Sequence, residues 1–491
     1  MVLTECTNFD ILMPLICLKL NLPTFLKTFF KEEIMKSTGL QIRSNRNLLL
    51  LLPVILTIIF YLSFVSPVYS QWSPLGTGTN SLVWTLNVYY NDLYAGGDFT
   101  TAGGISANHI AKWNGSVWQP LGLGTNGRVQ AMINYNSQLV AAGNFTQIGG
   151  ISAKSVAIWN GVNWIQFGSN AGFNGDITSL AIYDNKLFVA GWFTASGSTP
   201  LNHIAYWNGT AWIQPGTGLS DVVRTLCVYG NALVAGGGFL TAGSVSVNRI
   251  ARWNGSSWSG LGLGTNSDVW ALTVMNNDLY VGGSFTAVGG VGVNRIAKWN
   301  GSWSAIGLGM NSTVYVLTAY SNCLIAGGAF TTAGGISANR IARCDGSSWF
   351  ALGTGMNSYV LALGIYGSLF HAAGDFTTAD GNIANKIARW GTPVEVKQIN
   401  TSVPEKFELY QNYPNPFNPN TIIKFQIPNL SNCKLVVYDN LGREVSSLVN
   451  ETLQSGIYEI EWDGSNYSSG MYFYKLITDS YTETRKMMMI K

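Results

Sequence analysis

The chain contains little charge, little histidine and little cysteine. Only 11% of its 491 residues are charged and the formal net charge is +3, so no basic surface of the kind that binds nucleic acid is visible. The three histidines and six cysteines are scattered, and no two cysteines have the close spacing of a zinc site. We therefore expect no metal site, no cofactor and no scaffold built on disulfides.

Seven tryptophans recur at intervals of 45 to 48 residues. They are Trp72, Trp118, Trp164, Trp212, Trp258, Trp303 and Trp349. A repeat of this length made of short strands is typical of a β-propeller, in which each repeat forms one four-stranded blade. In the copy that begins at Val83, four short apolar runs alternate with turn residues. Pairs such as Asn114-Gly115 predict two-residue hairpins, because both positions tolerate a positive φ.

Every copy also contains the triplet Gly-x-Phe at the end of its second strand. The glycines are Gly97, Gly143, Gly191, Gly237, Gly283, Gly328 and Gly374. Glycine weakens a strand unless another group has to approach closely. We expect that group to be the third-strand tryptophan, such as Trp113, whose ring would cover the bare glycine backbone. We interpret the triplet as structural.

The repeat is offset from its ends. Gln71 to Leu75 has the pattern of an outermost strand before any blade exists, and the last copy ends at Trp390 without one. We expect the N-terminal strand to pair near Ile387–Trp390, because closing the ring removes an exposed sheet edge.

The expected fold class is all-β, with two folded domains. Residues 71–391 are predicted to form a seven-bladed β-propeller, followed by a linker at 392–404. From about Pro404 the period ends and charged residues return. Several short alternating strands then predict a small immunoglobulin-like β-sandwich at 405–491.

The N-terminus has the pattern of a targeting segment. Basic residues precede an apolar run at 48–65, and a small-residue cleavage site follows it. We assign 35–70 to a signal peptide, which makes Gln71 the first mature residue. Translation from Met35 would give a signal peptide of ordinary length, so we expect 1–34 to be an upstream extension. A membrane anchor is the alternative, since roughly 18 apolar residues can span a bilayer.

The repeat resembles the kelch and galactose-oxidase type of propeller, which has a glycine pair ending the second strand and an aromatic pair in the outer strands. It is also similar to the repeats of fungal cortical polarity marker proteins. Three copies depart from the glycine pair, with Ala142, Ala190 and Ala373 at its first position. The resemblance implies a fold and leaves the function open, because propellers serve as hydrolases, oxidases and binding platforms. Neither the ligands of copper oxidases nor the Asp boxes of sialidases are found.

A second set of motifs lies in the C-terminal region. Its residues are Tyr413, Pro414, Asn415, Pro416 and Phe417, a turn from Asp439 to Arg443 that contains Gly442, and a strand with Gly470 and Tyr472. In this order they resemble the type A C-terminal sorting domain of the type IX secretion system. The resemblance implies export by Sec and then by the type IX machinery in a Bacteroidota-like bacterium. We therefore expect an extracellular or cell-surface protein, released or attached to surface lipopolysaccharide.

One end of the predicted propeller collects small-residue loops, and ligands of propellers bind where such loops surround the axis. The second residue of the first strand varies between copies. We expect Trp84, Arg224, Trp270 and Tyr315 to line a funnel there and to bind a neutral glycan, a peptide or a protein ligand, because aromatic faces and polar donors suit sugars. The same side chains would otherwise pack between blades.

Two functions follow from these patterns. The first is a binding or adhesion platform without catalytic residues. The alternative is a secreted hydrolase or lyase acting on polysaccharide, with Asp176, Asp221 and Asp268 as candidate carboxylates. Convergence of two of them in one pocket would favour the enzyme, whereas a groove of Trp, Tyr and Asn would favour the binding platform.

Cys323 and Cys344 lie in the sixth copy, where Cys344 replaces the usual third-strand tryptophan. If the hairpin between them centres near residue 333 or 334, they face each other across adjacent strands. A disulfide is then favourable in an oxidising compartment. Two free thiols are the alternative.

Overall fold

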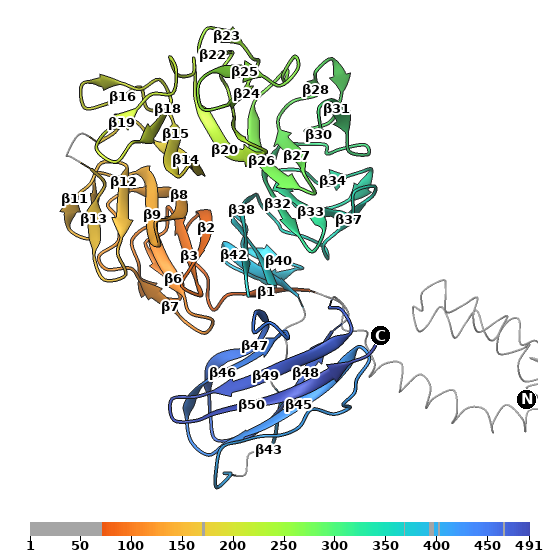
Figure 1. Cartoon of the computed structure of the whole chain (residues 1–491). Coiled ribbons are helices and arrows are strands. Elements are labelled where there is room, and N and C mark those ends of the chain that lie inside the picture. The colour runs from red at the N-terminus through yellow and green to blue at the C-terminus, as the bar shows by residue number, and fades with distance from the viewer. Residues whose placement is uncertain (1–70, 169–171, 368, 392–396, 401–402, 465–466) are drawn as a thin grey trace, which may run out of the picture. The chain divides into compact units, whose positions relative to one another are not determined.

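The computed structural model describes residues 71–168, 172–367, 369–391, 397–400, 403–464 and 467–491 (Figure 1). The predicted signal peptide and upstream extension lie outside these residues. All regular elements in the described ranges are β-strands, which confirms the predicted all-β class. Within the same ranges there is no helix of the length and apolarity needed to cross a membrane.

Seven four-stranded antiparallel sheets, or blades, follow one another in the described part of residues 71–391 (Figure 1). We number them one to seven by their innermost strands. These are β2 (Val83–Tyr89), β8 (Arg128–Tyr135), β14 (Ile177–Tyr183), β20 (Val223–Tyr229), β26 (Val269–Met275), β32 (Val314–Tyr320) and β38 (Val360–Tyr366). Each innermost strand lies against those of the two adjacent blades, and β38 lies against β2. The blades therefore form a closed ring.

The second strands run antiparallel to the innermost ones. They are β3 (Asp92–Gly97), β9 (Gln138–Asn144), β15 (Lys186–Gly191), β21 (Ala232–Gly237), β27 (Asp278–Gly283), β33 (Cys323–Gly328) and β39 (Leu369–Gly374). The third strands are β6 (Ile110–Trp113), β12 (Val156–Trp159), β18 (Ile204–Trp207), β24 (Ile250–Trp253), β30 (Ile296–Trp299), β36 (Ile341–Cys344) and β42 (Ile387–Gly391). Small two-stranded hairpins such as β4 (Thr101–Ala102) with β5 (Ile105–Ser106) connect the second strand to the third.

The outermost strands carry the periodic tryptophans. They are β7 (Trp118–Pro120), β13 (Trp164–Gln166), β19 (Trp212–Ile213), β25 (Trp258–Gly260), β31 (Trp303–Ala305), β37 (Trp349–Ala351) and, in blade seven, β1 (Gln71–Pro74). Strand β1 pairs with β42, with Trp72 opposite Trp390. Trp72 is 2% exposed, and its ring lies 5.3 Å from Phe370 between ring centroids. The N-terminal strand thus completes the last blade, as its pattern predicts.

The period of the tryptophans has a specific cause. The Trp118 indole N–H donates to the Leu75 carbonyl at 3.0 Å, and Trp164 donates to the Leu121 carbonyl at 3.2 Å. The same bond recurs in blades four to seven. Each bond ties the outer edge of one blade to the end of the preceding repeat, so the tryptophan has to recur once per blade.

The glycine of each Gly-x-Phe triplet is required by a different neighbour from the predicted one. A Cβ on Gly97 would lie 2.0 Å from the Leu82 carbonyl oxygen, and equivalent contacts of 2.0 to 2.2 Å occur in all seven blades. The third-strand Trp113 instead packs on Trp118 at 5.5 Å between ring centroids. The prediction that this tryptophan covers the glycine is wrong. Since the following Phe99 is fully buried, the triplet is nevertheless a packing element.

The Asn-Gly pairs do not form two-residue hairpins. Trp113 pairs with Trp118, which leaves a loop of four residues. Asn114 accepts backbone hydrogen bonds from Ser116 at 3.0 Å and Val117 at 2.9 Å, and so closes the loop with its side chain. The two-residue turns with positive φ lie instead between innermost and second strands, where residues such as Tyr90 take φ values of about 43°.

The predicted disulfide between Cys323 and Cys344 is wrong. Both cysteines are free. Cys344 lies opposite Leu324 across the sheet, and successive side chains of a strand point to opposite faces. The two sulfurs therefore lie on opposite faces, with Cys323 Sγ 3.8 Å from an Arg343 guanidinium nitrogen. The register differs by one residue from the one that a disulfide would need.

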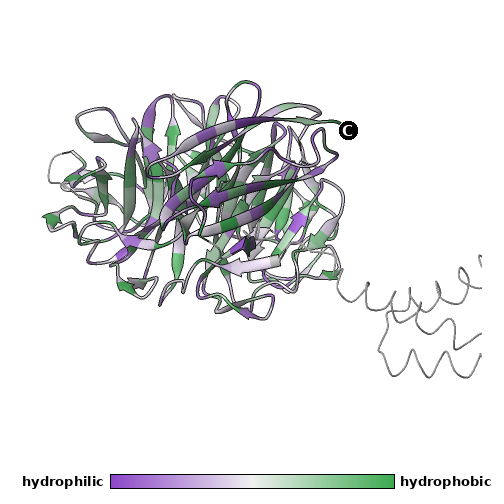
Figure 2. Ribbon diagram, turned by 90° about the horizontal axis from the view of Figure 1, so that it is seen from below, coloured by the Kyte–Doolittle hydropathy of each residue, from purple (hydrophilic) through white to green (hydrophobic). Residues whose placement is uncertain are grey.

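The C-terminal domain consists of two four-stranded sheets. One contains β43 (Lys397–Asn400), β48 (Gly456–Asp463), β45 (Asn420–Ile427) and β44 (Glu408–Leu409), and the other contains β47 (Glu444–Leu453), β46 (Ser431–Tyr438), β49 (Gly470–Ile477) and β50 (Thr482–Met489). Phe425 of the first sheet and Tyr474 of the second share one buried core. In both domains the hydrophobic stretches run along the strands (Figure 2).

Candidate functional site

Three residues of each blade meet at one end of its strands. In blade five, the backbone N–H of Ser284 donates to the Asp268 carbonyl at 2.9 Å, and the N–H of Arg295 donates to the Phe285 carbonyl at 2.9 Å. The first bond joins the residue before the innermost strand's leading Val or Ile to the middle residue of Gly-x-Phe. The second bond joins the residue before the third strand to the phenylalanine of the same triplet. We call these positions, in all seven blades, the mouth of the propeller.

The mouth residues differ from blade to blade. Before the leading Val or Ile they are Leu82, Arg128, Asp176, Val222, Asp268, Thr313 and Tyr359. In the middle of Gly-x-Phe they are Asp98, Asn144, Trp192, Gly238, Ser284, Ala329 and Asp375. Before the third strand they are His109, Ser155, His203, Arg249, Arg295, Arg340 and Lys386. The shared backbone bonds place the Cα atoms of these residues at equivalent positions in each blade. The blades therefore differ at the mouth in side-chain chemistry and not in backbone arrangement.

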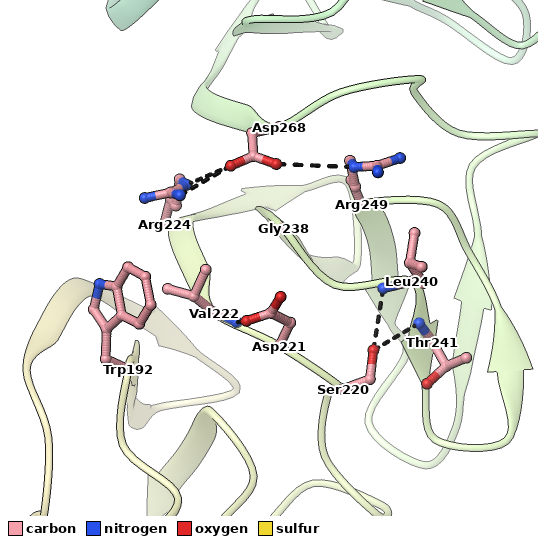
Figure 3. Close-up of a pocket in the computed structure, with 10 residues that line it drawn as sticks. All are labelled: Trp192, Ser220, Asp221, Val222, Arg224, Gly238, Leu240, Thr241, Arg249 and Asp268. Carbon is pink, nitrogen blue, oxygen red and sulfur yellow. Dashed lines mark hydrogen bonds and ion pairs between the residues drawn. The ribbon is translucent and has the colours of Figure 1, made fainter.

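A cavity of about 730 Å³ opens at the mouth, around blades three to five. We call it the mouth pocket (Figure 3). Its lining is Trp192, Ser220, Asp221, Val222, Arg224, Gly238, Leu240, Thr241, Arg249 and Asp268. Trp192 is 51% exposed, which is unusual for a residue type that is mostly buried. Such an exposed aromatic face is available to a ligand.

An ion-pair network forms one wall of the pocket. Asp268 lies between two arginines (Figure 3). Its Oδ2 accepts hydrogen bonds from Arg224 Nε at 3.1 Å and Nη2 at 2.9 Å, and its Oδ1 lies 3.8 Å from Arg249 Nε. The Arg224 guanidinium also lies 3.8 Å from the Trp270 ring centroid, a cation–π contact. The network holds the Arg224 side chain in one orientation.

Two carboxylates face the same part of the pocket. A Cβ on Gly238 would lie 3.6 Å from Asp221 Oδ2 and 3.7 Å from Asp268 Oδ1. Glycine at this position leaves open the space that both carboxylates border. The third candidate carboxylate, Asp176, lines no part of this pocket. Burial raises the pKa of Asp176, and the nearby Arg128 and Asn144 oppose the rise.

The four predicted ligand-binding residues divide into two groups. Arg224, Trp270 and Tyr315 form the first group. Arg224 lines the pocket, and its guanidinium packs on the Trp270 ring. The Trp270 ring lies 5.3 Å from that of Tyr315 at an interplanar angle of 77°. Trp84 belongs to blade one and lines no part of the pocket; its indole N–H donates to Asp98 Oδ2 at 2.8 Å. All four are half-buried, so none is enclosed between blades. Their role in binding stays a prediction.

Sequence reasoning missed Trp192 and Arg249. Trp192 occupies the middle of the third Gly-x-Phe triplet, so comparing the middle residues of the seven copies would have identified it. Arg249 precedes a third strand and has a φ of 72°, which no alternating pattern predicts. Among the described residues, no three His, Cys, Asp or Glu side chains gather as metal ligands.

Residues of two of the three sorting motifs line a second cavity, of about 340 Å³, in the C-terminal domain. Its lining includes Asp439 and Arg443 from one motif and Gly470 and Tyr472 from another. Asp439 Oδ1 accepts the Arg443 backbone N–H at 2.9 Å, and its Oδ2 accepts from Arg443 Nε at 2.7 Å. These bonds lower the pKa of Asp439. Gly442 has a φ of 75°, which the tight turn requires.

The first sorting motif is anchored by its last residue. Phe417 is 2% exposed and packs on Trp462 at 5.5 Å between ring centroids. Tyr413 is 79% exposed, although its backbone N–H donates to the Ile422 carbonyl at 2.9 Å. The peptide bonds before Pro414 and Pro416 are cis.

Comparison with known proteins identifies the C-terminal domain. Residues 411–491 match the family described as the secretion system C-terminal sorting domain. This domain directs export by the type IX secretion system to the cell surface or extracellular space. No curated protein shows significant similarity to the chain.

Solved structures resemble the chain at low similarity. One is PorZ of Porphyromonas gingivalis, described as an essential bacterial surface component of the type IX secretion system, with 13% identity and a TM-score of 0.40. The match covers 84% of this chain, which spans only 60% of the length of PorZ. Another is a protein of unknown function from Bacteroides thetaiotaomicron, with 10% identity and a TM-score of 0.35, covering 66% of this chain and 76% of that one.

Proposed function

We propose that the protein is a secreted or cell-surface binding platform whose propeller binds a glycan at the mouth pocket. The observation that carries this proposal is the exposed face of Trp192 beside the hydroxyl, carboxylate and guanidinium groups of one cavity. The sorting domain supplies the location, because it directs the protein out of the cell.

The chemistry of the pocket suits a sugar. The C–H faces of a sugar stack on aromatic rings, and its hydroxyls need both donors and acceptors. Trp192 provides the ring, Arg224 and Arg249 provide donors, and Asp221 provides an acceptor. A volume of about 730 Å³ lies within the range of small-molecule sites.

The alternative function, a polysaccharide hydrolase or lyase, is favoured by one observation. Asp221 and Asp268 converge beside Gly238, and paired carboxylates are the catalytic groups of most glycosidases. Against it, Asp268 is already engaged by Arg224 and Arg249. A carboxylate held in this way supports the arginines that line the pocket, and this favours binding over hydrolysis.

A glycan array probed with the secreted protein tests the proposal. We expect Trp192→Ala to abolish binding to every glycan that the natural protein binds on the array. Tyr90→Ala is the matched control, because Tyr90 is 73% exposed and lies in the turn at the opposite end of its blade. Equal loss in both variants, or full binding by Trp192→Ala, would contradict the proposed site. Release of reducing ends from a bound glycan, lost in Asp221→Asn, would establish the enzyme instead.

A further inference from the structure

The mouth is electrostatically divided. Blades four to seven place five cationic side chains at the mouth and in its pocket, together with three carboxylates. The cations are Arg224, Arg249, Arg295, Arg340 and Lys386, and the carboxylates are Asp221, Asp268 and Asp375. Blades one to three place only Arg128 there as a cation, with Asp98 and Asp176 as carboxylates. These side chains give blades four to seven two more positive than negative charges, whereas blades one to three have one more negative than positive charge.

Four of the cations occupy one structural position in four consecutive blades. The residue before the third strand has a φ between 63° and 72° in all seven blades. Glycine adopts this left-handed backbone without strain, whereas other residues do not. No copy has glycine at this position. Strained backbone that persists around an open site points to a function for the side chains. In blades four to seven those side chains are Arg249, Arg295, Arg340 and Lys386.

Two of these cations have no carboxylate partner among the described residues. Arg340 Nη1 donates to the carbonyls of Ala329 at 2.8 Å and Phe330 at 3.2 Å, and its Nε is buried without a hydrogen bond. The Arg295 side chain has no hydrogen-bond or ion-pair partner within the described ranges. Lys386, in contrast, pairs with Asp375 at 3.0 Å. The unneutralised charge is thus concentrated in blades five and six, next to the mouth pocket.

We infer that the ligand is an acidic glycan, one that carries carboxylate or sulfate groups. This inference rests on the proposed function and specifies its ligand class. One sugar ring stacks on Trp192, and the acidic groups of the adjoining sugars pair with Arg295 and Arg340. Guanidinium groups bind carboxylate and sulfate in a bidentate manner. In blades one to three Asp98 is paired with Arg128 at 2.6 Å, and the other carboxylate, Asp176, repels the same groups, so the glycan is directed along the positive side.

The test is an array in which each uronic-acid or sulfated glycan stands beside its methyl-esterified or desulfated form, together with poly-glutamate. We expect the secreted protein to prefer the charged member of a pair. Removing one charged contact should weaken binding about tenfold, so Arg295→Gln and Arg340→Gln should each lose that much affinity. Lys298→Gln is the matched control, since Lys298 belongs to the third strand of blade five, the blade of Arg295, and pairs with Asp278 at 3.0 Å.

Each outcome has a distinct meaning. If charged and neutral members bind equally and both arginine variants keep full affinity, the proposed glycan binding stands and the inference of an acidic ligand is wrong. If poly-glutamate binds as tightly as the best glycan, the ligand is an acidic peptide and the inference is likewise wrong. If no glycan binds at all, the proposed function itself fails.

Discussion

The propeller and the C-terminal domain are both all-β, but they are stabilised in different ways. In the propeller one set of contacts recurs, such as the hydrogen bond from Trp118 to the Leu75 carbonyl, which has counterparts in other blades. The described part of the C-terminal domain has no contact that recurs once per sheet around a ring. The Tyr474 hydroxyl donates to the Tyr410 carbonyl at 2.8 Å and accepts the N–H of the buried Asn412 at 2.8 Å. Repetition makes structural residues visible in a sequence, whereas single contacts are visible only by resemblance to other proteins.

The same comparison separates structure from function inside the propeller. Outer strands and Gly-x-Phe triplets agree between copies because every blade has the same packing to satisfy. Mouth residues sit on the same backbone frame, and yet no two copies have the same combination of side chains there. Other copies form the same blade structure with different residues at the positions of Trp192 and Arg295. The fold therefore does not require these two side chains, which leaves them available for ligand binding.

The largest expected effect comes from removing the C-terminal domain. A chain that ends at Gly391 should fold, because the propeller strands pair among themselves and β1 closes the ring. It should nevertheless remain in the periplasm, since the sorting domain is absent. Immunoblots of periplasm and medium measure the location, and circular dichroism measures the fold. The shortened protein appearing in the medium at full yield would show that the domain is not the export signal.

The second expected effect concerns the closing strand. Trp72→Ala removes a tryptophan that is 2% exposed and donates to the Leu352 carbonyl at 3.0 Å. We expect a loss of about 3–5 kcal/mol in the free energy of unfolding, the usual cost of truncating a buried aromatic. Urea denaturation measures it. Trp192→Ala is the control within the same domain and should change stability by less than about 0.5 kcal/mol. Similar losses in both variants would mean that the mouth is also part of the packed core.

The sequence predicts the repeated features of the propeller and the domain that resembles a known family. It does not predict contacts that depend on a strand register exact to one residue. The period of Trp72 and its six counterparts predicts the blades and the pairing of β1 with β42. The pattern predicts a close approach at the glycine of Gly-x-Phe, but the neighbour there is a carbonyl oxygen and not a ring. The cysteine pair failed because a shift of one residue moves a side chain to the other face of the sheet.

At the candidate site, the sequence points to Arg224, Asp221 and Asp268, which line the mouth pocket, but not to Trp192 and Arg249. Arg224 is the second residue of an innermost strand, a position that can be compared between copies because the strand pattern repeats. Arg249 lies at a left-handed residue between strands, and side chains there follow no period. Trp192 is predictable from the sequence, because it is the only tryptophan among the middle residues of the seven Gly-x-Phe triplets. The contact between Arg224 and Asp268 joins adjacent blades, so only the three-dimensional structure reveals it.

The third expected effect concerns a departure from the repeat. His371 is buried at a position that is Val234 in blade four. Burial, together with the nearby Arg389, lowers the pKa of His371 to about 3. The unfolded chain binds a proton near pH 6.5 that the folded protein cannot bind, so stability is full above that pH and falls below it. The slope should be about 1.4 kcal/mol per pH unit down to about pH 3.

His371→Val copies blade four and should remove this slope. The free energies of unfolding of both proteins, measured between pH 4 and pH 8, give the comparison, because carboxylate titration is common to the two. His371→Val should be the more stable protein at low pH, since it also removes an Nδ1 atom that is buried without a hydrogen bond. Parallel curves would show that His371 is protonated in the folded state.

The smallest expected effect tests whether Trp84, one of the four predicted ligand-binding residues, lies outside the mouth pocket. Trp84→Phe keeps an aromatic ring and removes the hydrogen bond of 2.8 Å to Asp98. Because Asp98 also pairs with Arg128 at 2.6 Å, the variant should lose only about 1–2 kcal/mol of stability. Glycan affinity should not change, since Trp84 lines no part of the mouth pocket. Urea denaturation and titration with the array's strongest glycan measure the two effects. A loss of affinity without a loss of stability would place Trp84 in the binding site and extend that site around the mouth to blade one.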